Sequence, residues 1–189
     1  MAILRILNVG LLVLVWFAGA PANTLERFAN SLPVFAASAG IQSQTDTLTI
    51  GVFSESDVPA ADLDVFKSLK TWDAELVQNV TQHNHIEVIP LQATTLETFE
   101  GQIIWVLDAT PKSLKLLKTY TEKGIFTIGM LDENYQNFLF TTLIYENKSD
   151  DPTIERWRLV KLIANCEISP LSYSKKLRSK PYFTGNGCE

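Results

Sequence analysis

Acidic side chains follow the ends of three apolar runs in this sequence. They are Glu55, Asp57, Asp108 and Asp132. If the runs are parallel strands of one sheet, these side chains share its carboxyl edge, the usual ligand site of an open sheet. Carboxylates that meet there could bind a cation or transfer protons. Asp is also a common turn residue, and no nucleophile or basic partner accompanies these four, so we predict a crevice without catalytic residues.

The histidines are confined to one short segment, as His83 and His85. On an extended backbone their side chains would point the same way, as two metal ligands do. No third ligand lies nearby in the sequence, so we favour an exposed turn. The chain also has no phosphate loop, dinucleotide fingerprint, nucleophile elbow or zinc-protease helix. We therefore expect no metal, no cofactor and no enzymatic activity, and keep small-ligand binding in the crevice as the alternative.

The first 22 residues predict a secretory signal peptide. Arg5 is the only charge, apolar residues 9–17 follow, and small residues lead to a cleavage site after Ala22. An uncleaved anchor is the alternative, which we disfavour because the apolar stretch is short for a membrane span. The remainder predicts one exported domain over 23–180 and a C-terminal tail over 181–189.

The two cysteines, Cys166 and Cys188, lie far apart and form no Cys-x-x-Cys motif. In a chain sent to an oxidising compartment, a disulfide that ties down the C-terminal tail is favoured over a redox role. The sequence leaves open whether the two pair within one chain or between two chains.

Basic residues are concentrated in residues 156–180, where Glu167 is the only acid. They are Arg156, Arg158, Lys161, Lys175, Lys176, Arg178 and Lys180. The whole chain carries a net charge of −5, which makes nucleic acid an improbable partner. The basic segment, without Lys180, is our predicted partner surface, suited to an acidic protein or anionic lipid headgroups. A solvated face is the alternative interpretation, and a homodimer and a small ligand also stay open.

Apolar runs and helical patterns alternate along the chain. Strands are predicted at 48–53, 86–91, 103–107, 125–130, 138–145 and 156–163, and helices at 25–36, 62–82, 94–99, 111–123 and 168–178. This alternation predicts an α/β fold. We expect a mixed open sheet of about five to six strands in a three-layer sandwich, with helices on both faces and an antiparallel C-terminal hairpin.

Residues 101–132 contain a complete strand–helix–strand unit with its end signals. Thr110 is the predicted N-cap, Pro111 occupies the first helical position, and Gly124 ends the helix. Thr94 and Glu97 have the spacing of a capping box before the preceding short helix.

Several segments resemble the YfiR family of bacterial periplasmic proteins. They are TIGVF at 49–53, IIWVLD at 103–108, FTIGMLD at 126–132, the late strand at 156–164 and LSYSKKL at 171–177. The chain departs from the family pattern at 134–137, where Gly-Gly is frequent, and at 101–102, where cysteines are often found. The different cysteine arrangement allows a different partner.

The resemblance implies a function that the residues alone do not indicate. In the best-understood role of the family, the protein binds the periplasmic sensor domain of an inner-membrane diguanylate cyclase and restrains cyclic-di-GMP signalling without catalysing a reaction. We therefore expect a periplasmic regulator whose partner is a membrane signalling protein. No functional residue is carried over, because no sharp functional motif is matched.

Overall fold

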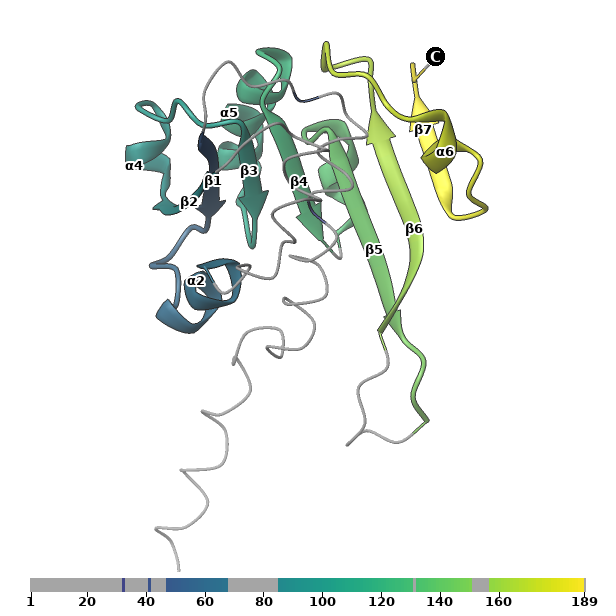
Figure 1. Ribbon diagram of the computed structural model, residues 1–189, viewed down its shortest axis with the longest axis horizontal. Coiled ribbons are helices and arrows are strands. Elements are labelled where there is room, and N and C mark those ends of the chain that lie inside the picture. The colour runs from purple at the N-terminus through teal and green to yellow at the C-terminus, as the bar shows by residue number, and fades with distance from the viewer. Residues whose placement is uncertain are drawn as a thin grey trace, which may run out of the picture.

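The computed structural model describes residues 32, 41, 47–67, 85–130, 132–150 and 157–188. Its centre is one seven-stranded sheet of order β2-β1-β3-β4-β5-β6-β7 (Figure 1). The strands are β1 (Thr47–Phe53), β2 (His85–Leu91), β3 (Ile103–Val106), β4 (Phe126–Met130), β5 (Thr141–Asn147), β6 (Trp157–Asn165) and β7 (Phe183–Asn186). The predicted α/β fold with a mixed open sheet is confirmed.

Pairing is parallel from β2 through β5, antiparallel between β5 and β6, and parallel again between β6 and β7. The antiparallel β5–β6 hairpin was predicted. Strand β7 was not, because it lies in residues 181–189, which we predicted as a tail. The backbone N–H of Leu162 donates to Tyr182 O at 2.7 Å, and that of Cys166 donates to Asn186 O at 2.8 Å.

Apolar side chains cover both faces of the sheet. One face packs against α4 (Ala93–Leu96), α5 (Pro111–Glu122) and the 3₁₀ helix η2 (Glu133–Asn137). The other packs against residues beside and within α2 (Ala60–Lys67), together with Leu32 and Ile41. A sheet between two covered faces gives the predicted three layers, and it explains why its strands read as continuous apolar runs.

Helix α5 has the predicted end signals. Thr110 Oγ1 accepts a hydrogen bond from Ser113 N at 3.3 Å, Pro111 opens the helix, and Gly124 follows its end with φ of 88°. A positive φ is strained for side chains other than Gly, so Gly124 is well placed to end the helix. Leu114 and Leu117 face the sheet, as their spacing predicted.

The capping box before α4 was predicted on the wrong residues. Gln92, not Thr94, is the N-cap, and Gln92 N donates to Thr95 Oγ1 at 2.9 Å. Glu97 follows the helix rather than capping its start. Strand β2 ends at Leu91 as predicted, and the helix follows it at once, so the N-cap lies two residues before the predicted one.

The predicted strand at 138–145 begins later, at Thr141. The N–H of Phe140 is held by the Thr127 hydroxyl at 2.8 Å, and the Thr121 hydroxyl donates to Phe138 O at 3.0 Å. Side-chain oxygens therefore replace ladder hydrogen bonds over the first residues of this apolar run. A pattern of apolar residues does not reveal such a replacement.

The last predicted helix, 168–178, is reduced to α6 (Lys175–Arg178). Ser174 is its N-cap and accepts from Lys176 N at 3.2 Å. The preceding residues pack without helical hydrogen bonds, with Tyr173 buried against Phe140 and Phe183. Pro170, which offers no N–H, is consistent with this irregular path.

Some predictions fall outside the described residues. They are the signal peptide at 1–22, most of the helix at 25–36, the helix at 62–82 beyond Lys67, His83 and Arg156. Within the described ranges, no helix combines the length and apolarity needed to cross a membrane.

Candidate functional site

Asp108 joins the loops that follow β1 and β3 at the carboxyl edge of the sheet. Its Oδ2 accepts from Ser54 Oγ at 3.0 Å, and its Oδ1 accepts from Glu55 N at 2.7 Å. Ser54 is only 2% exposed, and its hydroxyl also accepts from Ser56 N at 3.3 Å. Both oxygens of Asp108 therefore bond to the chain itself.

Glu55 occupies the N-terminus of α5. Its Oε1 accepts from the backbone N–H of Thr110 at 2.7 Å. The pKa of Glu55 is lowered chiefly by hydrogen bonds from the Ser113 hydroxyl and from Thr110 N–H. Burial opposes this shift, and the Thr110 hydroxyl and the charge of Lys112 add smaller decreases. The positive end of the helix dipole favours a carboxylate at this position, so Glu55 takes the place that an external anion would occupy.

Tyr135 brings η2 into the same cluster. Its hydroxyl accepts from Ala109 N at 3.1 Å, and its side chain is 6% exposed. Burial raises the pKa of Tyr135, with further increases from the charges of Asp132, Asp108 and Glu55. Tyr135 was not among the predicted site residues, because its only signal in the sequence is an aromatic side chain within a polar turn.

The other predicted crevice residues have their own partners nearby. Asp57 Oδ1 accepts from Gln92 Nε2 at 2.8 Å, which ties the loop after β1 to the end of β2. Asp132 Oδ1 accepts from Asn134 N at 2.8 Å and from Asn134 Nδ2 at 2.7 Å, as a cap for η2. The structure therefore joins Glu55 and Asp108 directly, while Asp57 and Asp132 hold neighbouring turns.

Metal-ligating side chains do not cluster in the part of the chain that the structure describes. No group of three or more His, Cys, Asp or Glu residues suited to a metal ion occurs there. His85 is exposed at the start of β2, at the opposite end of that strand from Gln92. Of the predicted histidine pair, only His85 lies within the described residues.

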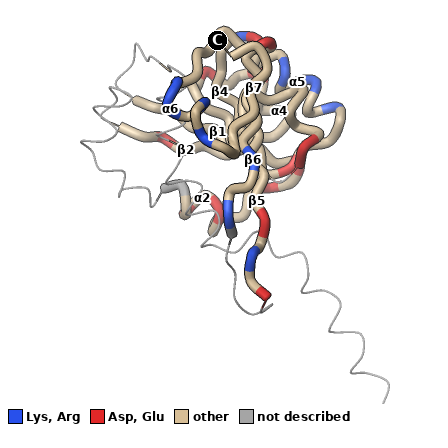
Figure 2. The backbone as a smooth tube through the Cα atoms, turned by 90° about the vertical axis from the view of Figure 1, so that its right-hand side faces the viewer, with Lys and Arg blue, Asp and Glu red and all other residues tan. Residues whose placement is uncertain are grey.

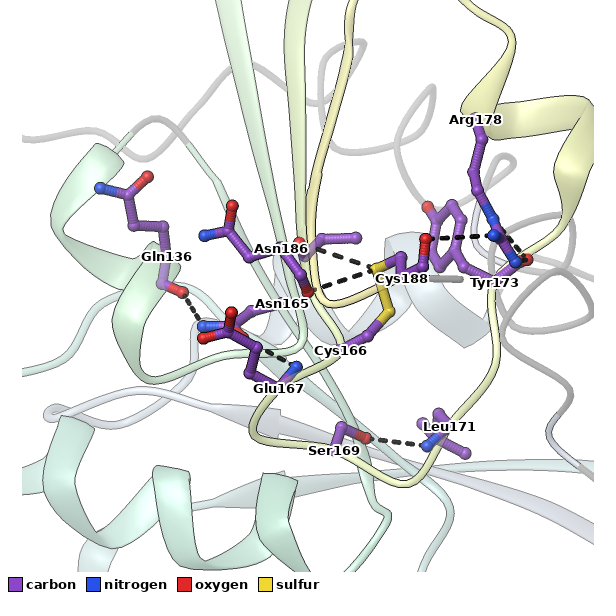
Figure 3. Close-up of a disulfide and its surroundings, with 11 residues drawn as sticks. Gln136, Asn165, Cys166, Glu167, Ser169, Leu171, Tyr173, Arg178, Asn186 and Cys188 are labelled. Carbon is purple, nitrogen blue, oxygen red and sulfur yellow. Dashed lines mark hydrogen bonds between the residues drawn. A yellow bond between two sulfur atoms is a disulfide. The ribbon is translucent and has the colours of Figure 1, made fainter.

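The basic segment divides into inward and outward side chains. Arg178, predicted on the partner surface, is half-buried: its Nε and Nη2 donate to Tyr173 O at 3.1 and 2.6 Å, and its Nη1 donates to Cys188 O at 3.1 Å (Figure 3). Its guanidinium is therefore engaged with the chain's own carbonyls. Its forked donors meet two carbonyls of the C-terminal segment, and its place on a partner surface stays a prediction.

The remaining basic residues point outward. Lys175 and Lys176 on α6 are exposed, as is Arg158 on β6. Lys161 forms an ion pair with Glu133 at 3.4 Å, with both side chains largely in solvent. Figure 2 shows basic segments at α6 and along β6 on the side of the molecule that faces the viewer.

Cys166 and Cys188 form a disulfide within one chain, which resolves the choice between one chain and two. The bond ties the end of β6 to the residues after β7 (Figure 3). Beside it, Asn165 Nδ2 donates to Gln136 O at 2.9 Å, which joins the end of β6 to η2. A disulfide of this kind is typical of proteins in oxidising, non-cytoplasmic compartments.

No protein-family model matches the chain, and no curated protein matches it. The resemblance to the YfiR family therefore rests on the segments quoted above and stays a prediction.

Proposed function

We propose that this protein is a periplasmic, non-enzymatic regulator, exported by its signal peptide, that binds the periplasmic sensor domain of an inner-membrane diguanylate cyclase. The proposal combines the YfiR-like segments with one structural observation. Lys175 and Lys176 are presented outward on a helix whose third basic residue, Arg178, bonds to the chain itself.

The contacts that attach α6 to the rest of the domain support a role for this helix in docking a partner protein. Arg178 attaches the helix to Tyr173 and Cys188, Tyr173 packs against the rings of Phe140 and Phe183, and the disulfide closes the same region. Lysines on a fixed support lose less conformational freedom on binding than lysines on a loose tail. An acidic face on the sensor domain is the complementary surface.

The strand-end crevice supports a role without catalysis. Asp108 accepts hydrogen bonds from Ser54 and Glu55, and Glu55 accepts one from Thr110. These carboxylates thereby stabilise two loops and a helix terminus. This structural role accounts for their placement, and small-ligand binding there has no specific observation in its favour.

The test uses the purified protein and the purified periplasmic domain of a membrane diguanylate cyclase from the same organism. We expect Lys175→Glu/Lys176→Glu to weaken binding at least about tenfold, because charge reversal turns attraction into repulsion. Lys115→Glu/Lys118→Glu on α5 changes the net charge equally on another face and should bind like the wild type.

A second measurement follows cyclase activity in membranes that contain the full-length sensor. The wild-type protein should lower cyclic-di-GMP synthesis, and the α6 variant should not. If the wild-type protein neither binds the sensor domain nor alters synthesis, the proposed function is wrong. If the α6 variant binds as tightly as the control, the sensor does not dock on α6.

A further inference from the structure

Strands β5 and β6 continue together beyond their neighbours. Strand β4 pairs with β5 only through residues 141–143, and β7 pairs with β6 only through residues 162–165. The hairpin nevertheless stays paired as far as Asn147 and Trp157. Residues 144–147 and 157–161 thus form a two-stranded ribbon, visible as the lower part of β5 and β6 in Figure 1, with no third described strand beside it.

The outer edge of this ribbon lies directly in line with β7. At the junction, Leu162 N donates to Tyr182 O, immediately before β7 begins at Phe183. Below that point, residues 157–161 have no described strand on the side that β7 occupies further along. Unpaired N–H and C=O groups on a strand edge are a template for an added strand.

Basic side chains lie along this edge of β6, and Glu146 of β5 stands opposite Arg158 on the inner side of the ribbon. Arg158 is exposed on the ribbon, and Lys180 is exposed beside the junction, where its carbonyl accepts from Phe183 N at 3.0 Å. Lys161 adds a third positive charge, held only by a solvent-exposed ion pair with Glu133. Ion pairs of that kind contribute little, so Lys161 can be shared with a partner at small cost.

These basic side chains indicate which kind of chain segment can pair with the edge of β6. Pairing two copies of the chain through this edge would bring two basic edges together, and like charges across paired strands are destabilising. An extended segment with acidic side chains avoids the repulsion.

We propose that the edge of β6 at residues 157–161 receives an extended acidic segment of a partner protein as an added strand. The added strand would lie in line with β7, with Arg158, Lys161 and Lys180 along it. The inference rests on the proposed function in taking the partner to be a protein. It goes further by adding a second contact, on the ribbon, to the one proposed on α6, and by assigning its mode of recognition.

The probe is a short fluorescent peptide in which Glu alternates with Val, added to the intact disulfide-bonded protein. Binding is followed by anisotropy, and hydrogen exchange is followed at the amides of residues 157–161. We expect saturable binding and slower exchange at those amides. A matching peptide with Lys in place of Glu should not bind.

Two variants with equal loss of charge separate the ribbon from α6. Arg158→Gln/Lys161→Gln should weaken binding of the acidic peptide by roughly fivefold or more, because both charges lie along the added strand. Lys175→Gln/Lys176→Gln should change it less than about twofold, because only long-range attraction is reduced. Circular dichroism and thermal melts verify that both variants are folded.

Equal weakening by both variants, or binding that leaves exchange at residues 157–161 unchanged, would overturn strand addition. The test of the ribbon site and the test of the proposed regulator function can fail independently of each other. A sensor domain that binds the ribbon variant as tightly as the wild type contradicts the ribbon site and leaves the regulator proposal standing. A wild-type protein that binds the acidic peptide as predicted but no sensor domain contradicts only the regulator proposal.

Discussion

Glu55 and Thr110 are hydrogen-bonded at 2.7 Å although 55 positions separate them in the chain. The bond places a carboxylate from the loop after β1 on the first turn of α5, which follows β3. The Glu55 carboxylate, which belongs to the same chain, thereby accepts a hydrogen bond at the N-terminus of α5. In other open α/β sheets, such a helix N-terminus can bind an anionic ligand. The bond gives the Glu55 carboxylate a structural role at this edge of the sheet.

Replacing Glu55 by Gln should lower the free energy of unfolding by about 0.5–1 kcal/mol at neutral pH, the lower part of the range for caps because the side chain is exposed. Because the folded-state pKa of Glu55 lies below its ordinary value of 4.5, the stabilisation is complete above that value. It is lost as the pH falls through the lower folded-state pKa. Urea unfolding of both proteins across this pH range measures the difference, and a difference that grows on acidification contradicts the assignment.

Removal of the disulfide by Cys166→Ser/Cys188→Ser should destabilise the protein by about 3 kcal/mol, since the bond closes a loop with a sequence separation of 22. Hydrogen exchange should accelerate first in β7, which lies inside that loop and pairs with the end of β6 just before Cys166. Urea unfolding and amide exchange are the measurements. An unchanged exchange rate in β7 would show that its ladder to β6 does not need the covalent bond.

Arg178→Gln should destabilise the protein by roughly 1–2 kcal/mol, because its guanidinium donates to Tyr173 O and Cys188 O. Lys176→Gln removes the same charge from an exposed position on the same helix and should change stability by less than about 0.5 kcal/mol. Thermal and urea unfolding compare the two variants. Equal effects would mean that charge, and not the hydrogen bonds of Arg178, determines stability here.

Tyr173→Phe should leave stability unchanged or raise it by up to about 1 kcal/mol. The Tyr173 side chain is 3% exposed, and its hydroxyl and that of Thr141 make no hydrogen bond of normal geometry among the described residues. The Thr141 hydroxyl nevertheless lies close enough to oppose the effect of burial on the pKa of Tyr173. Burial also raises the pKa of Tyr173. Tyr173→Ala, which empties the space between Phe140 and Phe183, should cost about 3–5 kcal/mol. A loss above 1 kcal/mol for Tyr173→Phe would reveal a partner for the hydroxyl, such as a buried water.

Local sequence determined the features that depend on near neighbours. The apolar run at 103–107 predicted a buried strand, and the order Thr110, Pro111, Gly124 predicted both ends of α5. These signals are readable because capping hydrogen bonds and helical periodicity join residues a few positions apart. The two cysteines of a chain predicted to be exported likewise predicted a disulfide, though not whether it lies within one chain.

Tertiary structure alone decided which distant groups meet. The strand order places Asp108 beside Ser54 and Glu55. The C-terminal segment returns along β6, where the predicted tail forms strand β7. This return also brings Cys188 O within hydrogen-bonding distance of Arg178. A carboxylate can accept hydrogen bonds from many donors, and a guanidinium can donate to many carbonyls. The residue type alone therefore does not predict the partner. The partner is set by which backbone the packed sheet brings within about 3 Å of it.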